Sequence, residues 1–507
     1  MRVAMSRWWA AGLGIGLMLG TGWADDWPLY RGPHGDGICR ERINLDWPAE
    51  GPRKLWSVPL TNGLSSVTVS QGRVFTQVWR RVSDQNTEFC LALDAGAGQI
   101  LWTRPVGPAD YRDGQVPSFD GPRSTPSVAG DRVYVLGSHL QLHCLEAATG
   151  RPVWSKDLVG EFGSTVISWQ NAASPLIVGD RIFLNLNAGP NRLAALRASD
   201  GSVIWRRHDH RLTHATPVPA TIHGIDQIIF FTQTGLVAVA PDTGNELWLY
   251  PFGFSLATAA SPVVDGNTVF CSAAYSRGAA AVSIEVAGTE LTPVQQWKST
   301  IAMQLHWSTA VAKAGHVFGL TGQASHFDAP LRCVDLATGE QKWSEPGFGL
   351  GATLLVNDRI LALTEGGEVV VVDPDPAGYR ERARFRAVPG RIWNSPAISN
   401  GRLYVRGTTE LAAFDVSLPG PGPLKLLPPT IDDVGTLRLT VAGADGVPLE
   451  PSRAAGVEVL MADDTGSPLA QWARLEAGVT WVNGRLQLEA PTVGGGSRRF
   501  FILRENR

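Results

Sequence analysis

The chain has 507 residues, with 44 Lys and Arg against 47 Asp and Glu, so its formal net charge is −3. This near-neutral balance gives no basic surface for the phosphates of nucleic acids or anionic lipids, and it argues against both as partners. The chain is rich in Gly (56) and Pro (34), and only 18% of it is charged. This composition is typical of a large, turn-rich β-protein.

The first 24 residues have the pattern of a secretory signal peptide. Arg2 and Arg7 precede an uncharged run from Trp8 to Trp23, and small residues stand at the −3 and −1 positions of a cleavage site after Ala24. An uncleaved membrane anchor is the alternative, although the run is short and rich in Gly for a membrane span. We therefore expect an exported protein, periplasmic or extracellular, with no transmembrane segment in its mature part.

A sequence repeat fills the middle of the chain. Its clearest part has the form Ala-x-Asp-x-x-x-Gly-x-x-x-Trp, as in Ala92–Trp102. Upstream of this part stand a Ser/Thr-Pro dipeptide, a tight turn such as Asn400-Gly401, and a run of Val, Ile or Phe. Pro is tolerated where a strand begins, and Asn-Gly turns join antiparallel strands. Each unit therefore predicts four short antiparallel strands, which is one blade of a β-propeller.

The number of these units predicts eight blades. The last unit, residues 395–414, has only three strands, whereas residues 54–59 form an isolated fourth strand near the start of the chain. Pairing the two completes a blade and closes the ring, which removes exposed sheet edges. Seven blades is the alternative if residues 353–385 are irregular. The other six units span residues 67–102, 125–154, 173–205, 215–248, 260–297 and 309–343.

Two residue types in the repeat have a structural interpretation. We expect the Trp residues to lie on outer strands and to wedge between neighbouring blades, rather than to form an aromatic platform for a ligand. Cys144 and Cys333 stand where other copies have Ala, so we expect two small, buried side chains that are too far apart to pair. The five Cys show neither zinc nor haem spacing. The Trp residues of the clearest copies are Trp102, Trp154, Trp205, Trp248 and Trp343.

The repeat resembles that of the pyrroloquinoline-quinone (PQQ)-type β-propellers. This family includes quinoprotein alcohol dehydrogenases and the non-enzymatic propeller of the bacterial outer-membrane protein assembly machine. The segment Trp27–Gly37 is also similar to the opening of exported bacterial members. The resemblance covers residues 26–416 and implies an all-β, eight-bladed propeller. It implies little about activity, because the motif belongs to the scaffold.

Ligand contacts in a propeller gather around the central channel, where the inner strands begin. The residues expected there are polar or aromatic, a mixture that small-molecule pockets use. Ordinary hydration of a channel mouth is the alternative interpretation. The candidate rim residues are Arg123, Trp169, Asn171, His214, His306, Trp307, Trp393 and Asn394.

Quinone chemistry would need a cation held by carboxylate and amide oxygens, a basic side chain and a general base. Asn171 and Arg123 could serve as ligands, but no rim Asp or Glu stands out. The adjacent half-cystines of the quinoprotein alcohol dehydrogenases are also absent from the sequence. We therefore assign no catalytic, cofactor-binding or metal-binding residue. No cofactor is expected, and PQQ with calcium is kept as an alternative.

Two further groups are interpreted without a metal. His208 and His210 are one residue apart and would point to opposite faces of a strand, with no nearby Cys or Glu to complete a tetrahedron. The acidic pairs Asp373/Asp375 and Asp463/Asp464 do not match a calcium-binding loop, and we interpret them as turns.

The composition and the sequence pattern change after the repeats. Residues 417–430 form a linker rich in Pro and Gly, and residues 431–507 contain short alternating strands with a hairpin turn at Asn483-Gly484. A small β-sandwich is predicted there, in an accessory role. The expected organisation is a signal peptide (1–24), a lead-in segment (25–53), the propeller (54–416), the linker and the sandwich.

Together these features predict an exported, non-catalytic propeller that acts as a binding or scaffold protein in the bacterial cell envelope. An envelope protein or polymer is the expected partner, and a monomer is the expected state. One alternative is a PQQ-dependent alcohol or sugar dehydrogenase with a divergent site. A second is carbohydrate binding or cleavage at the propeller rim.

Overall fold

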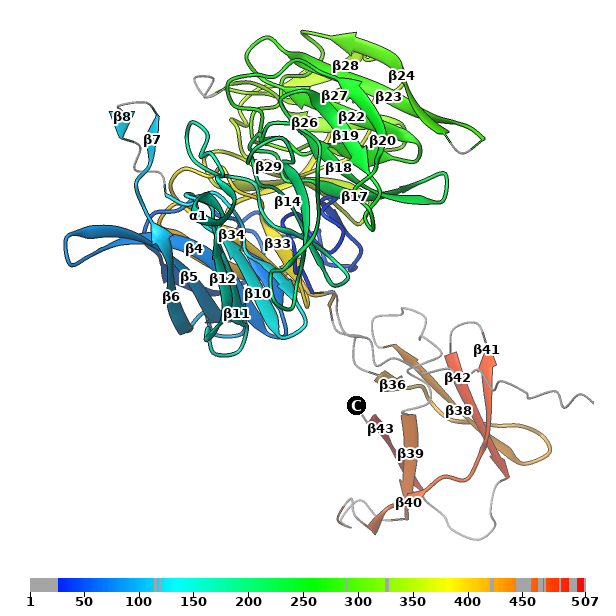
Figure 1. Ribbon diagram of the computed structural model, residues 1–507. Coiled ribbons are helices and arrows are strands. Elements are labelled where there is room, and N and C mark those ends of the chain that lie inside the picture. The colour runs from blue at the N-terminus through cyan, green and yellow to red at the C-terminus, as the bar shows by residue number, and fades with distance from the viewer. Residues whose placement is uncertain are drawn as a thin grey trace, which may run out of the picture. The chain divides into compact units, whose positions relative to one another are not determined.

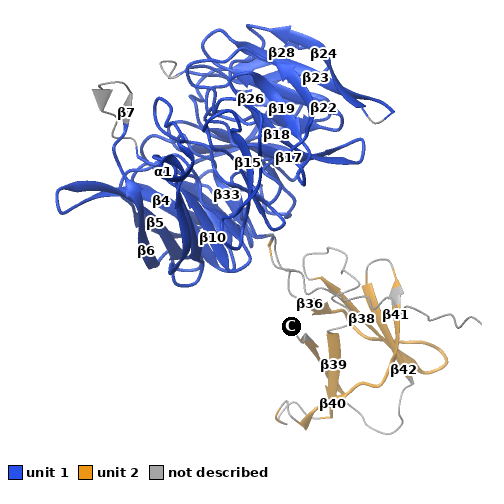
Figure 2. Ribbon diagram, in the orientation of Figure 1, with its two compact units in different colours: residues 1–418 blue, residues 419–507 orange. Residues whose placement is uncertain are grey.

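The protein, seen here as a computed structural model, has two compact units, residues 1–418 and 419–507 (Figure 1) (Figure 2). Both consist of β-sheets, and one short helix, α1 (Leu158–Phe162), lies in the described part of the chain. No helix of that part is long and apolar enough to span a membrane. The predicted signal peptide lies outside the described residues. These are 26–113, 116–117, 121–288, 290–323, 328–419, 424–443, 457–463, 468, 471–482, 485–491 and 499–505.

Eight sheets, here called blades, account for most of the described part of unit 1: each has four antiparallel strands, and one of them gains a fifth, parallel strand from the lead-in segment. The first four are β3–β6 (Thr68–Ser70, Arg73–Val82, Gln85–Asp94, Ile100–Pro108), β9–β12 (Ser127–Ala129, Arg132–Leu136, Gln141–Glu146, Pro152–Asp157), β13–β16 (Leu176–Val178, Arg181–Asn185, Leu193–Arg197, Val203–Arg207) and β17–β20 (Val218–Ile222, Ile225–Phe231, Gly235–Val239, Glu246–Pro251).

The remaining four blades follow in chain order, and a short hairpin, β7 (Arg112–Asp113) and β8 (Val116–Pro117), lies between the first two. They are β21–β24 (Val263–Asp265, Thr268–Ala273, Gly278–Ala287, Glu290–Ser299), β25–β28 (Val311–Lys313, His316–Leu320, Leu331–Asp335, Gln341–Glu345), β29–β32 (Ala352–Val356, Arg359–Leu363, Glu368–Val372, Glu381–Arg386) and β33–β35 with β2 (Ala397–Ser399, Arg402–Arg406, Glu410–Asp415, Lys54–Pro59).

The last blade is built from both ends of the propeller sequence. Strand β2 pairs antiparallel with β35, with Trp56 opposite Ala413 and Val58 opposite Leu411. The prediction that an early strand completes the final blade is therefore confirmed.

Hydroxyl groups link the starts of the innermost strands around the ring. In each link, a backbone N–H of one blade donates to a Ser or Thr hydroxyl of the next blade, and the last blade is linked to the first in this way. Several of these residues directly precede the Pro that opens an inner strand. The Ser/Thr-Pro dipeptide therefore both begins the strand and links neighbouring blades. The donor–acceptor pairs are Ser66–Thr125 (3.1 Å), Thr125–Ser174 (2.9 Å), Ser174–Thr216 (3.0 Å), Ser261–Thr309 (2.9 Å) and Ser395–Ser66 (2.9 Å).

Each motif Trp faces a small residue on the neighbouring strand of its own blade. Cys144 lies opposite Trp154, and Cys333 lies opposite Trp343, where other blades have Ala. Both Cys are buried and unpaired, as the repeat predicts. A bulky residue here would collide with the indole on the pleated surface, which explains why the position is small. The Ala–Trp pairs are Ala92–Trp102, Ala195–Trp205, Ala238–Trp248, Ala281–Trp297 and Ala413–Trp56.

The indole rings also contact the next blade. Trp102 donates its N–H to the carbonyl of Ala147 in the next blade (3.0 Å). Its ring also covers Gly150 of that next blade, so closely that a Cβ added to Gly150 would lie 2.6 Å from the indole. Gly150 has a φ of +67°, so both its conformation and its packing require glycine. The interpretation of these Trp residues as wedges between blades is confirmed by such contacts. The equivalent Trp–Gly pairs are Trp56–Gly98, Trp154–Gly201, Trp205–Gly244 and Trp297–Gly339.

Trp248 departs from this pattern. Its N–H donates to Gln227 Oε1 (2.6 Å), which belongs to its own blade. In the following blade Ala287 pairs with Glu290, and the motif glycine is missing, because Pro293 stands four residues before Trp297. Trp248 is still buried among residues of both blades.

The lead-in segment lies against the innermost strands rather than outside the ring. Trp27 exchanges two backbone hydrogen bonds with Val69 of β3 (2.8 Å each), and β1 (Ile38–Cys39) pairs in parallel with β29. Between them, the buried Arg31 guanidinium donates to the carbonyls of Thr309 and Thr353 (3.0 Å each), which belong to the sixth and seventh blades. The segment thus connects blades that are distant in the sequence.

Unit 2 has two sheets that share a hydrophobic core, as predicted for a small β-sandwich. Leu439 and Leu488 of one sheet and Val459 of the other belong to one buried cluster. The predicted turn at residues 483–484 lies outside the described residues, although the strands on either side of it pair. The first sheet has β36 (Leu424–Leu426), β37 (Thr430–Ile431), β38 (Thr436–Gly443), β41 (Gly478–Val482) and β42 (Arg485–Pro491), and the second has β39 (Val457–Ala462), β40 (Ala473–Arg474) and β43 (Phe500–Glu505).

Candidate functional site

A cavity of about 290 Å³ lies on the axis of the propeller. Its walls come from the loops that lead into inner strands of seven blades, together with Tyr30 of the lead-in segment and Tyr275 of the turn between β22 and β23. Such a position and size are typical of small-molecule sites, which measure roughly 300–1,000 Å³. Six of the eight candidate rim residues line this cavity, namely Arg123, Trp169, His214, His306, Trp307 and Trp393.

The other two candidates, Asn171 and Asn394, do not line it. Both are buried, with 1% and 3% of their surface exposed. Asn171 donates from its side chain to the Ala173 carbonyl (2.9 Å) and so stabilises the turn before β13. Asn394 directly follows the cavity-lining Trp393, and adjacent residues of an extended segment point to opposite sides. Asn171 instead follows Trp169 and Gln170, whose positive φ values (60° and 58°) turn the chain.

Two indole rings form one wall of the cavity. The ring centroids of Trp307 and Trp393 are 4.2 Å apart, and the planes are tilted by 41°. Both indole N–H groups are occupied: Trp307 donates to the Leu350 carbonyl (2.7 Å), and Trp393 donates to Glu365 Oε1 (2.9 Å). The rings are therefore held in place, and a ligand would meet apolar ring surface.

Two buried histidines contribute polar atoms. Burial lowers the pKa of His214 to about 4 and that of His306 to about 3, so both imidazoles are neutral at pH 7. His306 Nε2 lies 3.1 Å from the Tyr275 hydroxyl. No hydrogen-bond partner for Nδ1 of either histidine occurs among the described residues. Both nitrogens are buried, so the cavity wall contains two unpaired polar atoms beneath its surface.

Arg123 is the only charged residue among the described residues that line the cavity. It donates to the Trp169 carbonyl (2.9 Å), and its guanidinium lies 5.8 Å from the centre of the Tyr111 ring. Tyr111 in turn donates to the buried carboxyl of Glu88 (2.6 Å), whose pKa is raised by burial. Arg123 gives one part of a mainly apolar, otherwise uncharged cavity a positive charge.

These groups do not fit a calcium-bound PQQ. Calcium takes carboxylate and other oxygen ligands, and no Asp or Glu occurs among the described residues that line the cavity. Glu365, behind Trp393, has both oxygens engaged, because Oε2 accepts the Leu350 N–H (3.1 Å) while Oε1 accepts the Trp393 indole. The cavity can hold an aromatic or apolar group near one cation, but it lacks a carboxylate base.

The prediction for His208 and His210 is wrong in its reasoning. His208 follows the end of β16 and has a φ of +59°, so the strand alternation stops there. Both imidazoles turn toward Glu246, the first residue of β20 in the next blade. Spacing alone could not reveal this carboxylate, which lies 36 residues after His210.

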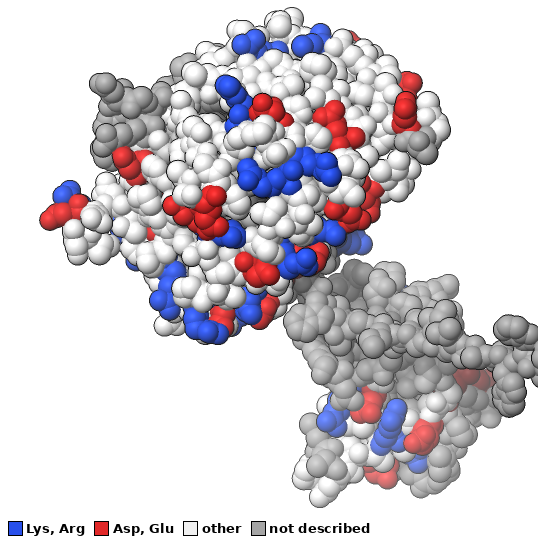
Figure 3. Space-filling model, viewed as in Figure 1, with Lys and Arg blue, Asp and Glu red and all other residues white. Residues whose placement is uncertain are grey.

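On the face of unit 1 that Figure 3 shows, acidic and basic side chains form small mixed groups, and wide uncharged areas separate these groups. This mixed surface agrees with the near-neutral composition.

A family model described as "Outer membrane protein assembly factor BamB" matches residues 86–345, just over half of the chain. The chain belongs to this family. Two curated BamB proteins are similar to it: that of Shewanella oneidensis is 27% identical over 158 residues, and that of Burkholderia pseudomallei is 25% identical over 276 residues. These matches cover 30% and 53% of the chain, and 36% and 63% of the two relatives, so the chain spans less than two thirds of either.

Other members of the PQQ-type group are similar as well. The quinoprotein ethanol dehydrogenase of Pseudomonas aeruginosa is 28% identical over 149 residues, 26% of this chain and 23% of that protein. The crystal structure of BamB from Moraxella catarrhalis superposes with a TM-score of 0.50 at 15% identity, covering 72% of this chain and 97% of that one. Quinohemoprotein alcohol dehydrogenase from Comamonas testosteroni gives 0.52 at 14% identity, with 80% and 83% covered. These structures establish the β-propeller fold.

Proposed function

We propose that this protein is an exported, non-catalytic member of the BamB family that binds a protein or polymer of the bacterial cell envelope through the central cavity. The observation that carries the proposal is the composition of the cavity: fixed indole rings and one Arg, without a carboxylate. Such walls bind an aromatic or apolar group and offer no acid or base pair for catalysis. The names of the two BamB relatives, which describe outer-membrane protein assembly factors, support a protein partner.

The remaining features fit this role. A signal peptide at residues 1–24 would direct export, and the protein would act as a monomer. Unit 2, a compact unit of its own, would serve as an accessory module for attachment or recognition.

We expect Trp307→Ala to weaken binding of an aromatic-rich peptide at least tenfold, because one wall of the cavity is lost. The probe is a synthetic peptide with alternating aromatic and polar residues, the pattern of an outer-membrane β-strand. Binding is measured by titration calorimetry on the mature full chain. Ile301→Ala, at a side chain that is 78% exposed, is the matched control and should bind as the wild type does. Equal affinity of the Trp307 variant would show that the cavity is not the binding site.

A PQQ-dependent dehydrogenase is the alternative: Arg123 and the indole rings could hold a planar anion, but the described cavity lining supplies no carboxylate ligand for its calcium. Adding PQQ, calcium and an artificial electron acceptor to the purified protein tests it with a panel of alcohols and sugars. Substrate-dependent reduction of the acceptor would overturn the non-catalytic proposal. Tight binding of oligosaccharides instead of the peptide would favour the carbohydrate alternative.

A further inference from the structure

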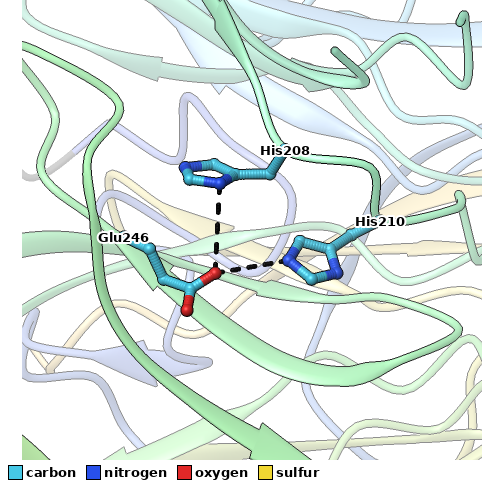
Figure 4. A group of neighbouring side chains, drawn as sticks. All are labelled: His208, His210 and Glu246. Atoms are coloured by element: carbon cyan, nitrogen blue, oxygen red, sulfur yellow. Dashed lines mark hydrogen bonds and ion pairs between the residues drawn. The ribbon is translucent and has the colours of Figure 1, made fainter. Parts of the chain in front are cut away.

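A second polar cluster lies away from the cavity, between the third and fourth blades. It comprises His208 and His210 in the loop after β16 and Glu246 at the start of β20 (Figure 4). His210 Nε2 is 3.3 Å from Glu246 Oε2, and His208 Nδ1 is 4.0 Å from the same oxygen. One nitrogen from each imidazole and one carboxylate oxygen thus lie within 4.8 Å of one another.

The backbone holds the two imidazoles on the same side. The positive φ of His208 turns the chain out of the strand, and the His208 carbonyl accepts the Arg192 N–H (2.8 Å). The two rings are stacked, with centroids 6.0 Å apart and planes inclined by 27°. Asp209, between them, forms an ion pair with Arg192 and takes no part in the cluster.

The outer nitrogens of both rings have partners that suit metal ligands. His208 Nε2 lies 2.7 Å from the Gly244 carbonyl, which can only accept, so Nε2 carries the proton and the Nδ1 lone pair faces Glu246. His210 Nε2 donates to Glu246 Oε2 (3.3 Å), and a metal ion would replace that proton. Thr234 Oγ1, 3.1 Å from His210 Nδ1, can then accept the N–H of the other tautomer. Metal-binding histidines usually donate their second N–H to a carbonyl or another acceptor in this way, which fixes the tautomer.

We propose that His208 Nδ1, His210 Nε2 and Glu246 bind a zinc ion. Two imidazoles and one carboxylate form a known type of zinc site, in which a fourth, open position takes water or another ligand. Neighbouring ligand atoms around a tetrahedral zinc are about 3.3 Å apart, so the side chains need to move by only ~1 Å. His208 and His210 are partly exposed and Glu246 is exposed, which leaves the fourth position accessible.

The ion would connect the outer strands of two blades. It would also fix the start of the loop between β16 and β17, which carries His214 to the cavity four residues after His210. This inference does not depend on the proposed function, because none of its three ligands lines the cavity.

Metal binding by the EDTA-treated full chain tests the proposal. Titration calorimetry with Zn²⁺ should show one ion per chain, and Co²⁺ should give the intense visible absorption of a tetrahedral site. His210→Ala and Glu246→Gln should each lower zinc affinity at least 100-fold and abolish the Co²⁺ band. The matched control is His316→Ala: His316 lies 3.8 Å from Asp335 but has no second imidazole, so its loss should change neither measurement.

Folding of the variants is checked separately by thermal melting. Zinc should raise the Tm of the wild type and of His316→Ala, because an ion that binds only the folded state stabilises it, and it should leave the Tm of the two ligand variants unchanged. A wild type without the Co²⁺ band, or ligand variants that bind zinc as tightly as the wild type, would show that the cluster is an ordinary histidine–carboxylate ion pair and would overturn the proposal.

Discussion

Acidification from pH 7 to pH 4 is expected to destabilise the propeller by about 3 kcal/mol through each of His214 and His306. Their folded-state pKa values, about 4 and about 3, are below the ordinary value of 6.5 because burial disfavours the charged form. Below pH 6.5 the unfolded chain therefore binds more protons than the folded chain. Stability falls as the pH drops from 6.5 towards 3–4, where the folded-state groups begin to protonate.

The local charges act in the same direction. Arg123 disfavours a second positive charge on His214, and His214 does the same for His306. The measurement is the urea midpoint of the propeller at pH 7 and pH 4, followed by Trp fluorescence. Carboxylates contribute to acid unfolding in every variant, so His214→Gln and His306→Gln serve as references and should each remove about 3 kcal/mol of the pH-dependent loss. An equal loss in wild type and double variant would contradict the assignment.

Trp205→Ala is expected to destabilise the propeller by about 3–5 kcal/mol, because removal of a buried indole leaves a cavity between two blades. Trp205 donates its N–H to the Pro241 carbonyl (2.9 Å) and lies over Gly244, and its ring centroid is 6.1 Å from that of Phe183. The loss combines the contacts of both blades, so the urea midpoint should fall markedly.

Two further variants separate packing from general effects. Trp205→Phe keeps an aromatic ring but lacks the N–H donor, so its loss should be intermediate. Ile301→Ala, at an exposed side chain, should change the free energy of unfolding by less than about 0.5 kcal/mol. A midpoint of Trp205→Ala equal to that of Ile301→Ala would refute the wedge between blades.

The propeller was predictable from the sequence because the residues that recur in each repeat are the ones that pack between blades. The glycine four residues before Trp102 turns the chain and provides the surface on which Trp56 of another blade packs. Local turn chemistry and long-range packing thus require the same residue at the same place. Trp248 shows the limit of this reasoning, because its surroundings depend on a following blade that lacks the motif.

The location of the cavity was also predictable, since residues just before inner strands must approach the axis. Which side chains face it was not, because the orientation depends on the turns in each loop: Asn171 and Asn394 turn away, whereas Tyr275 and Tyr30 approach. Tyr30 belongs to the lead-in segment, and nothing in its own sequence places it in the ring.

Two features of the structure were not predicted, because they depend on contacts between residues that are distant in the sequence. The hydroxyl links around the axis join residues of different blades, although the recurring Ser/Thr before Pro was a visible signal. The approach of Glu246 to His208 depends on a positive φ at a non-glycine residue, which propensity does not predict.

The pairing of β2 with β35 has a consequence for biogenesis. Strands of the other blades are consecutive in the chain, so each of these blades can form soon after its own residues are made. The final blade must wait, because Trp56 meets Ala413 across more than 350 residues. Until then β2 remains an unpaired edge that invites association with other chains. We therefore expect completion of the ring to be the last and slowest stage of folding, and the stage most dependent on chaperones.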